Sequence, residues 1–325
     1  MERTLGEIEC SFTQQLHQWT EQFRPYSAQG KCAAYIPALA EANPEHLGVC
    51  IAHPNGQVMK AGEWDIPFTM QSISKVIGFM AACSVCGMEE VLNRVDVEPT
   101  GDAFNSIIRL EAHKPGKPFN PMINAGAITV SSLLPGKEPA DKLEPILSLL
   151  EKILGKRPLV NENVFKSEWE TAYLNRSLAY YLKQNGFLAA GVEEALEVYS
   201  RQCSIQVTAE DLAKISLVIA DDGFDPFQGK QMIPRRITKV TKALMLTCGM
   251  YNASGKLAAF VGVPAKSGVS GGIMAAIPPR GRRGAPFQEG GGIGIYGPAI
   301  DQVGNSVSGL MVLKDMAEHW DLNIF

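Results

Sequence analysis

The chain has 325 residues, of which 46% are hydrophobic and 20% are charged. This length and composition allow one large core or two smaller ones, and they exclude a disordered or fibrous protein. The formal net charge of −4 gives no strong positive field for phosphate groups, so we expect a small-molecule partner and no nucleic acid.

The N-terminal residues and the cysteines indicate a cytoplasmic protein. Residues 1–9 are acidic and lack the basic start and apolar run of a secretory signal. No apolar run approaches the roughly 18 residues that a membrane span requires. The seven cysteines are odd in number and scattered, which is typical of reduced thiols. We therefore expect no membrane segment and no disulfide.

The first elements are predicted from hydrophobic spacing and turn residues. Apolar residues at helical spacing predict an amphipathic helix over residues 5–23. Residues 47–53 and 57–62 are strand-like and flank Asn55-Gly56, a pair typical of a hairpin turn. Residues 72–86 contain no proline and are almost entirely apolar after Lys75, which predicts a buried helix.

Helical patterns dominate residues 90–215, and strands return near the end of the chain. We predict helices at residues 141–154, 176–186 and 192–203, strands at 257–263, 271–277 and 290–295, and a closing helix at 306–320.

This order of elements predicts an α+β fold with segregated layers. Strands at both ends of the chain would form one antiparallel sheet flanked by helices, with an all-helical domain inserted into it. We assign residues 1–66 and 216–325 to the sheet domain and residues 67–215 to the helical domain.

Ser72 and Lys75 form the pattern S-x-x-K at the start of a predicted helix. Helical positions i and i+3 lie on one face with β-carbons about 5–6 Å apart, so the hydroxyl and the amine can meet. A lysine activates a serine only when it is partly neutral. The apolar surroundings and the positive end of the helix both disfavour the charged amine. The pair is therefore a candidate nucleophile and base.

The tripeptide Lys266-Ser267-Gly268 supports this interpretation. A chain of this length contains roughly one S-x-x-K by chance, and this chain has one. In acyl-serine enzymes of the β-lactamase and penicillin-binding class, S-x-x-K is followed later in the chain by K-[S/T]-G on a strand. Both the order and the predicted context agree, although the tripeptide alone would be an ordinary turn at a strand edge.

The sequence also resembles the serine-dependent glutaminase family over residues 30–320. The phrases that carry the resemblance are Tyr35-Ile36-Pro37-Ala38-Leu39, Gln71-Ser72-Ile73-Ser74-Lys75, Asn120-Pro121-Met122-Ile123-Asn124-Ala125-Gly126-Ala127, Cys248-Gly249-Met250-Tyr251 and Pro264-Ala265-Lys266-Ser267-Gly268-Val269-Ser270-Gly271-Gly272. The resemblance implies a β-lactamase/penicillin-binding-protein-like fold and hydrolysis of L-glutamine to L-glutamate and ammonia. It further implies no cofactor and a homo-oligomer, either a dimer or a tetramer.

The resemblance assigns roles to individual residues. Ser72 would be the acylated nucleophile, Lys75 its base and Tyr251 a second proton carrier near the leaving ammonia. The backbone N–H groups of Ser72 and Val269 would form the oxyanion hole. The implied substrate contacts are Glu168 for the α-ammonium, Asn124 and Asn175 for the α-carboxylate, and Tyr35, Gln71 and Tyr199 in the pocket.

Purely structural interpretations of these residues stay open. Tyr35 and Tyr199 could be core aromatics, and Asn124 could cap a helix. Glu168 and Asn175 are seven residues apart, so they could lie on one polar helix face. The sequence around Glu168 matches the family weakly, which leaves Glu170 as an alternative ammonium contact. Residues 279–292 are longer and more basic than the family pattern, and their role is open.

Two other functions also stay open. One is an acyl-serine hydrolase that acts on β-lactams or peptide-like amides, and the other is a catalytically silent relative that binds an amino acid.

Two other patterns predict no functional site. The pair Cys83 and Cys86 lies in an apolar helix, which favours a core position over metal or redox chemistry. The G-x-G-x-x-G pattern of residues 292–297 is followed by Pro298 where a phosphate-binding helix would begin. The histidines show no ligand spacing, so we expect no metal.

Overall fold

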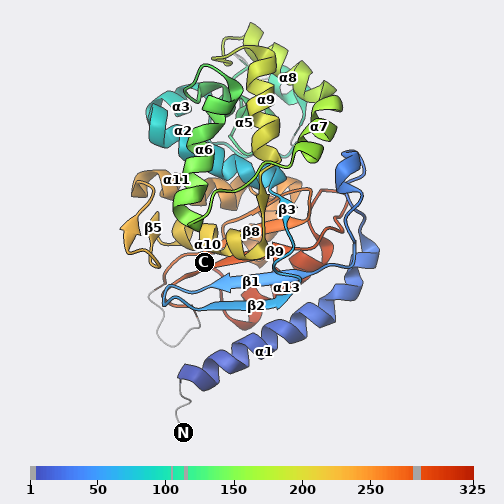
Figure 1. Ribbon diagram of the computed structural model, residues 1–325, viewed down its shortest axis with the longest axis vertical. Helices are drawn as coiled ribbons and strands as arrows, with labels where there is room; N and C mark the ends of the chain where they lie inside the picture. Colours follow the sequence, from blue (N-terminus) through green and yellow to red (C-terminus); the bar gives the residue numbers. More distant parts are fainter. Residues whose placement is uncertain (1–4, 104, 113–115, 281–286) are drawn as a thin grey trace.

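The computed structural model describes residues 5–103, 105–112, 116–280 and 287–325. An antiparallel sheet of order β2-β1-β9-β8-β7 forms its lower half (Figure 1). The strands are β1 (Gly48–Ala52), β2 (Val58–Gly62), β7 (Ala265–Ser267), β8 (Gly272–Ile277) and β9 (Gly291–Tyr296). β1 pairs with β9, so both ends of the chain contribute to one sheet. The predicted α+β class and its antiparallel sheet are confirmed.

The two faces of the sheet are covered by different helices, because side chains alternate between the faces. On one face, Ile51, Ile273 and Ile295 pack with α1 (Leu5–Phe23) and α13 (Val307–His319). The other face lies against α10 (Ala209–Ala220). A Cβ added to Gly294 would lie 1.9 Å from the carbonyl oxygen of Ala209, so α10 rests directly on β9.

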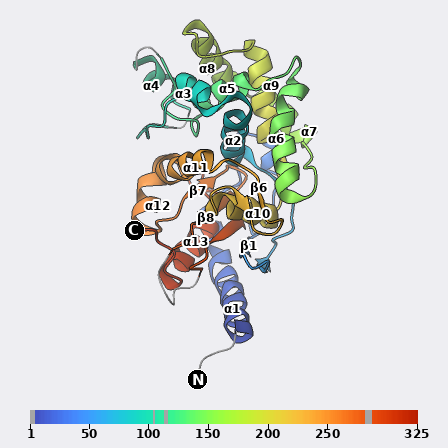
Figure 2. The ribbon, with the colours of Figure 1, turned by 90° about the vertical axis from the view of Figure 1, so that its left-hand side faces the viewer.

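The helical part of the chain lies beyond α10, on the same side of the sheet (Figures 1 and 2). It contains α2 (Ser74–Cys86), α3 (Met88–Arg94), α4 (Ile107–Ala112), α5 (Asn124–Leu133), α6 (Pro139–Leu154), α7 (Glu162–Glu170), α8 (Tyr173–Gln184) and α9 (Val192–Cys203). A short pair, β3 (Phe68–Thr69) and β4 (Gln206–Val207), brackets this region. Between them the described residues form no strand, and the predicted helical insertion is confirmed.

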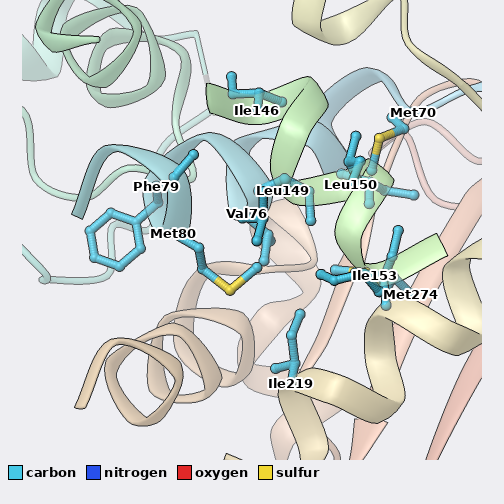
Figure 3. Close-up of a cluster of buried hydrophobic side chains, with 14 of the residues drawn as sticks. Met70, Val76, Phe79, Met80, Ile146, Leu149, Leu150, Ile153, Ile219 and Met274 are labelled. Carbon is cyan, nitrogen blue, oxygen red and sulfur yellow. The ribbon is translucent and has the colours of Figure 1, made fainter. Parts of the chain in front are cut away.

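One hydrophobic core joins the helical part to the sheet (Figure 3). Met80 of α2 and Leu150 of α6 belong to the same cluster as Ile219 of α10 and Met274 of β8. The division of the chain at residues 67 and 215 remains a prediction, and its second boundary falls inside α10.

One predicted strand is wrong. Residues 257–263 fall mostly within the helix α12 (Ser254–Phe260). The prediction failed because an apolar run this short does not distinguish a strand from a helix. Helix α11 (Arg235–Cys248) was not predicted as an element. The remaining elements are β5 (Phe224–Asp225), β6 (Lys230–Gln231) and the 3-10 turns η1 (Arg24–Gln29), η2 (Pro37–Leu39), η3 (Gln71–Ile73) and η4 (Tyr251–Ala253).

Candidate active site

Ser72 lies in the 3-10 turn η3, directly before α2. The α-helix begins at Ser74, later than predicted, because residues 71–73 form the 3-10 turn, and Gln71 at its start has a φ of 48°, outside the right-handed helical region. A positive φ at a non-glycine residue is strained, and such strain is concentrated at functional sites. The turn places Ser72 in the lining of a cavity.

Lys75 follows in the first turn of α2, and its side chain is only 2% exposed. Its Nζ donates hydrogen bonds to the carbonyl oxygen of Met122 at 3.3 Å and to Oδ1 of Asn124 at 2.6 Å. Burial lowers the pKa of Lys75 to about 8, although the nearby Cys203 and Glu168 act in the opposite direction. With this pKa about a tenth of the amine is neutral at pH 7 and about half at pH 8, and the neutral amine is the form that acts as a general base.

Asn124 connects this lysine to other predicted contacts. Its Oδ1 also accepts a hydrogen bond from the Tyr199 hydroxyl at 3.3 Å, and its Nδ2 donates to Oδ1 of Asn175 at 2.9 Å. Asn124 is the first residue of α5 and does not cap that helix. The helix-cap interpretation is therefore wrong, and the side chain belongs to a polar network beside Lys75.

Glu168 is a buried carboxylate near the end of α7, with its Oε2 3.5 Å from Nε2 of Gln71. Burial raises the pKa of Glu168 to about 7, and hydrogen bonds from Gln71 and Cys203 and the charge of Lys75 offset only part of this effect. A cation bound here would favour the ionised carboxylate. Glu170 is exposed and does not line the cavity.

The helical stripe expected for Glu168 and Asn175 is wrong. Helix α7 ends at Glu170 and α8 begins at Tyr173, so the two residues belong to different helices. Both nevertheless line the same cavity, because the chain changes direction between these helices.

Tyr251 approaches Ser72 from the C-terminal part of the chain. It lies in η4 with a φ of 52°, a second strained backbone in the site. The Nζ of Lys266 lies 4.5 Å from the centre of the Tyr251 ring. Burial raises the pKa of Tyr251, whereas hydrogen bonding to Ser72 and Ser267 acts in the opposite direction. The phenol therefore lies between the hydroxyls of these two serines.

The turn after β7 brings Val269 to the segment before Ser72. A Cβ added to Gly268 would lie 2.5 Å from the carbonyl oxygen of Met70, so this close approach requires glycine. Within the described chain, the N–H groups of Ser72 and Val269 donate to no backbone acceptor. Two such groups at one cavity can stabilise an oxyanion.

Apart from Tyr251, which lines a smaller neighbouring cavity, the predicted substrate contacts meet at one cavity of about 330 Å³. This volume is in the range of small-molecule sites. The predicted residues in its lining are Tyr35, Gln71, Ser72, Asn124, Glu168, Asn175, Tyr199 and Val269. Tyr35 is 58% exposed, so the core interpretation is wrong for it, whereas Tyr199 is buried.

Some residues of the site were not singled out from the sequence. Cys203 lines the cavity, and its Sγ lies 3.8 Å from Oγ of Ser74. Asn105 also lines the cavity. A scattered cysteine or a loop asparagine carries no spacing pattern, so only the folded chain identifies them. Ser267, in contrast, lies inside the K-S-G motif.

Neither a metal centre nor a membrane segment is found in the part of the chain that the structure describes. No group of three or more His, Cys, Asp or Glu side chains there is placed to hold a metal ion. No helix there has both the length and the apolar character to cross a membrane. Residues 281–286 of the basic segment at 279–292 lie outside the described residues.

A lysine three residues after a serine at the start of a helix, with a later K-S-G strand, is characteristic of serine hydrolases with the β-lactamase-like fold. Within this class, the chain belongs to the Glutaminase family, whose sequence model matches residues 30–325.

Relatives are similar over nearly the whole chain. The chain is 63% identical over 310 residues to Glutaminase 2 of Bacillus anthracis, with 95% of each sequence covered. It is 62% identical over 311 residues to Glutaminase 1 of Bacillus subtilis (strain 168), with 96% of this chain and 95% of the relative covered.

Solved structures also match nearly the whole chain. A probable glutaminase of Bacillus subtilis superposes with a TM-score of 0.92 at 60% identity, over 97% of this chain and 98% of the other. A Bacillus subtilis glutaminase in covalent complex with 5-oxo-L-norleucine, formed by reaction with 6-diazo-5-oxo-L-norleucine, has a TM-score of 0.88 at 56% identity, over 96% of this chain and 99% of the other. The β-lactamase-like fold expected from the sequence is thus confirmed.

Proposed function

We propose that the protein is a glutaminase that hydrolyses L-glutamine to L-glutamate and ammonia through an acyl-serine intermediate on Ser72. The observation that carries the proposal is that Ser72 and the buried carboxylate of Glu168 line one cavity. The same cavity thus offers a nucleophile for an amide and an anion for an ammonium group. The glutaminases in the comparisons support the choice of glutamine.

In the proposed acylation, Lys75 accepts the hydroxyl proton of Ser72 while Oγ attacks the side-chain amide carbon. The N–H groups of Ser72 and Val269 stabilise the oxyanion. The C–N bond then breaks, and Tyr251 gives its phenolic proton to the leaving nitrogen, which departs as ammonia. The proton on Lys75 then returns to Tyr251, so the acyl-enzyme has both groups in their starting states.

In the proposed deacylation, water attacks the Ser72 ester and gives up a proton to the same bases. The C–Oγ bond breaks, Ser72 regains its proton, and glutamate is released. Glu168 holds the α-ammonium through both steps, and Asn124 and Asn175 hold the α-carboxylate. Tyr35, Gln71 and Tyr199 complete the walls of the pocket.

The test measures ammonia release from glutamine and from asparagine, and ring opening of a penicillin as a β-lactam control. We expect turnover of glutamine, and we expect Ser72→Ala to lower kcat by at least about a thousandfold because the covalent step is lost. The melting temperature of this variant should match the parent. Penicillin turnover without glutamine turnover contradicts the proposed function, and full activity of the variant contradicts the proposed nucleophile.

We further infer a cytoplasmic homo-oligomer, either a dimer or a tetramer, that acts on free L-glutamine without a cofactor. The location rests on the odd number and scattered positions of the cysteines, which are typical of reduced thiols. The oligomer rests on the resemblance to the family. Light scattering after size exclusion measures the assembly directly, and a monomer at micromolar concentration contradicts it.

A further inference from the structure

The corner between α7 and α8 lies between two residues of the candidate site. Glu168, proposed to hold the α-ammonium, lies before the corner, and Asn175, proposed to hold the α-carboxylate, lies after it. Both line the same cavity, so the geometry of the corner sets the distance between the two contacts. A backbone hydrogen bond across the corner, from the N–H of Ala172 to the carbonyl oxygen of Trp169, is 3.5 Å long and therefore weak.

Arg176 joins the two sides of this corner with its side chain. It follows Asn175 directly in α8, and its Nη1 donates to the carbonyl oxygen of Trp169 at 3.1 Å. Its guanidinium carbon also lies 4.6 Å from the centre of the Trp169 ring, close enough for a cation–π contact. Trp169 in turn follows Glu168 directly. Each proposed head-group contact thus has a direct neighbour in this arginine–tryptophan pair.

A third helix fixes the orientation of the Arg176 guanidinium. Its Nε donates to Oε2 of Glu193 at 3.3 Å, and Glu193 lies in the first turn of α9. The planar guanidinium can stack on the ring, bind the carbonyl oxygen and bind the carboxylate at the same time. A lysine at this position has a single ammonium group and cannot stack in this way. The contacts of Arg176 therefore join α7, α8 and α9 at one point.

A second arginine holds α7 one turn earlier, away from the corner. The guanidinium carbon of Arg201 lies 4.1 Å from the centre of the Phe165 ring. Its Nη1 donates to Glu162 at 3.0 Å and its Nε to Glu197 at 2.8 Å. Among the described residues, its side chain makes no hydrogen bond with residues 168–176. Arg201 therefore attaches the same helix by the same kinds of contact without bracing the corner.

We propose that Arg176 is a positioning residue that sets the spacing of Glu168 and Asn175, and thereby the selectivity of the site for an α-amino acid. The proposal rests on the proposed function. Arg176 is not among the described residues that line the cavity, so it acts through the corner. Without its side chain the two contacts shift relative to each other, and one head group no longer reaches both. A ligand without an α-ammonium does not need both contacts and loses little.

The test compares two competitive inhibitors of glutamine hydrolysis in Arg176→Met. These are L-glutamate and glutarate, which has no α-amino group. The inhibition constant of glutamate should rise at least about tenfold, because a charged hydrogen bond is misplaced. That of glutarate should change less than about twofold. The KM of glutamine should rise with the glutamate constant while kcat changes less than about threefold, as expected when substrate binding alone is weakened. Arg176→Lys, which keeps a donor for the Trp169 carbonyl oxygen, should lie between parent and Arg176→Met.

Arg201→Met is the matched control, because it removes an aromatic stack and two carboxylate contacts of α7 but nothing at the corner. Both arginine variants should have lower melting temperatures than the parent. Only Arg176→Met should change the ratio of the glutarate and glutamate inhibition constants. This ratio therefore distinguishes positioning of the head-group contacts from attachment of the helix.

The possible outcomes separate the two proposals. Equal losses for glutamate and glutarate in Arg176→Met, or the same change of ratio in Arg201→Met, give Arg176 only a structural role and overturn the inference. If Arg176→Met does not fold, an unchanged ratio in Arg176→Lys overturns it. If the parent chain binds glutamate but releases no ammonia from glutamine, the proposed function fails, and calorimetric binding constants of the same two ligands decide on Arg176. A parent chain that neither releases ammonia nor binds glutamate contradicts both proposals.

Discussion

Lys75 and Glu168 are both buried, and burial favours the neutral form of each. The proposed reaction needs the neutral form of Lys75 but the charged form of Glu168. Burial favours neutral Lys75, which suits a base, but it also favours protonated Glu168, which cannot hold an ammonium group. Activity therefore requires a pH above the pKa of Glu168, about 7, and is highest where Lys75 is neutral, above about 8. We expect kcat/KM to rise with pH through both values. A profile that is flat between about pH 6 and 9 contradicts these assignments.

Replacing Glu168 tests the same site from the substrate side. Glu168→Gln removes the only charge proposed to meet the α-ammonium, so KM should rise at least about tenfold. Glu170→Gln, two residues away on the surface, is the matched control and should keep the parent KM. The opposite result would move the ammonium contact to Glu170.

Lys75 also reduces the stability of the fold. Its folded pKa lies below the ordinary value of 10.5, so the folded state binds fewer protons than the unfolded chain between about pH 8 and 10.5. Stability contributed by this group therefore rises with pH across that window and is lowest below about pH 8. Lys75→Met should abolish activity and raise the free energy of unfolding at pH 7 by about 1–3 kcal/mol.

Lys142→Met provides the control for this stability prediction. Lys142 is also buried and donates to a carbonyl oxygen, that of Leu134, but unlike Lys75 it also has a carboxylate within 3.3 Å, that of Glu194. Removing it breaks these contacts, so this variant should be less stable than the parent. Denaturant unfolding measures both, and a destabilised Lys75→Met contradicts the prediction.

At the scale of elements, the glycines of β9 explain the G-x-G-x-x-G pattern. A Cβ on Gly292 would lie 2.0 Å from the carbonyl oxygen of Ala213, and the corresponding contact at Gly294 is equally short. The glycines thus let α10 approach the sheet and bind no phosphate. Gly294→Ala should destabilise the protein by about 3 kcal/mol or more. Gly291→Ala, whose added Cβ meets nothing closer than 3.3 Å, should cost far less in the same unfolding experiment.

Elements with a local cause were predictable from the sequence. The β1–β2 hairpin followed from Asn55-Gly56, and α2 followed from its apolar composition and from Gly87, whose φ is 88°. The break between α7 and α8 and the strained Gln71 depend on segments distant in sequence. The motif phrases therefore identified the main site residues, whereas the contacts of Arg176 at that break required the folded chain.

At the scale of the whole molecule, the shared core predicts a single unfolding transition. Each part has a buried cluster of its own, but Leu150 of the helical part and Met274 of the sheet lie in one further cluster that joins the two parts. We expect one calorimetric peak, and Leu150→Ala should lower its midpoint without splitting it, at a cost of about 2–5 kcal/mol. Two separated peaks would mean that the helical and sheet parts unfold independently.

The pairing of β1 with β9 also constrains the order in which a growing chain can fold on the ribosome. β1, at residues 48–52, leaves the ribosome long before its neighbour at residues 291–296 is made, and domains generally fold as units during synthesis. Until then, one edge of β1 is open to pairing with other chains. A transcript cut before β9 would thus yield a product that contains Ser72, Lys75 and Tyr251 and yet is prone to aggregate, so chaperone demand should stay high until residues 291–296 have been made.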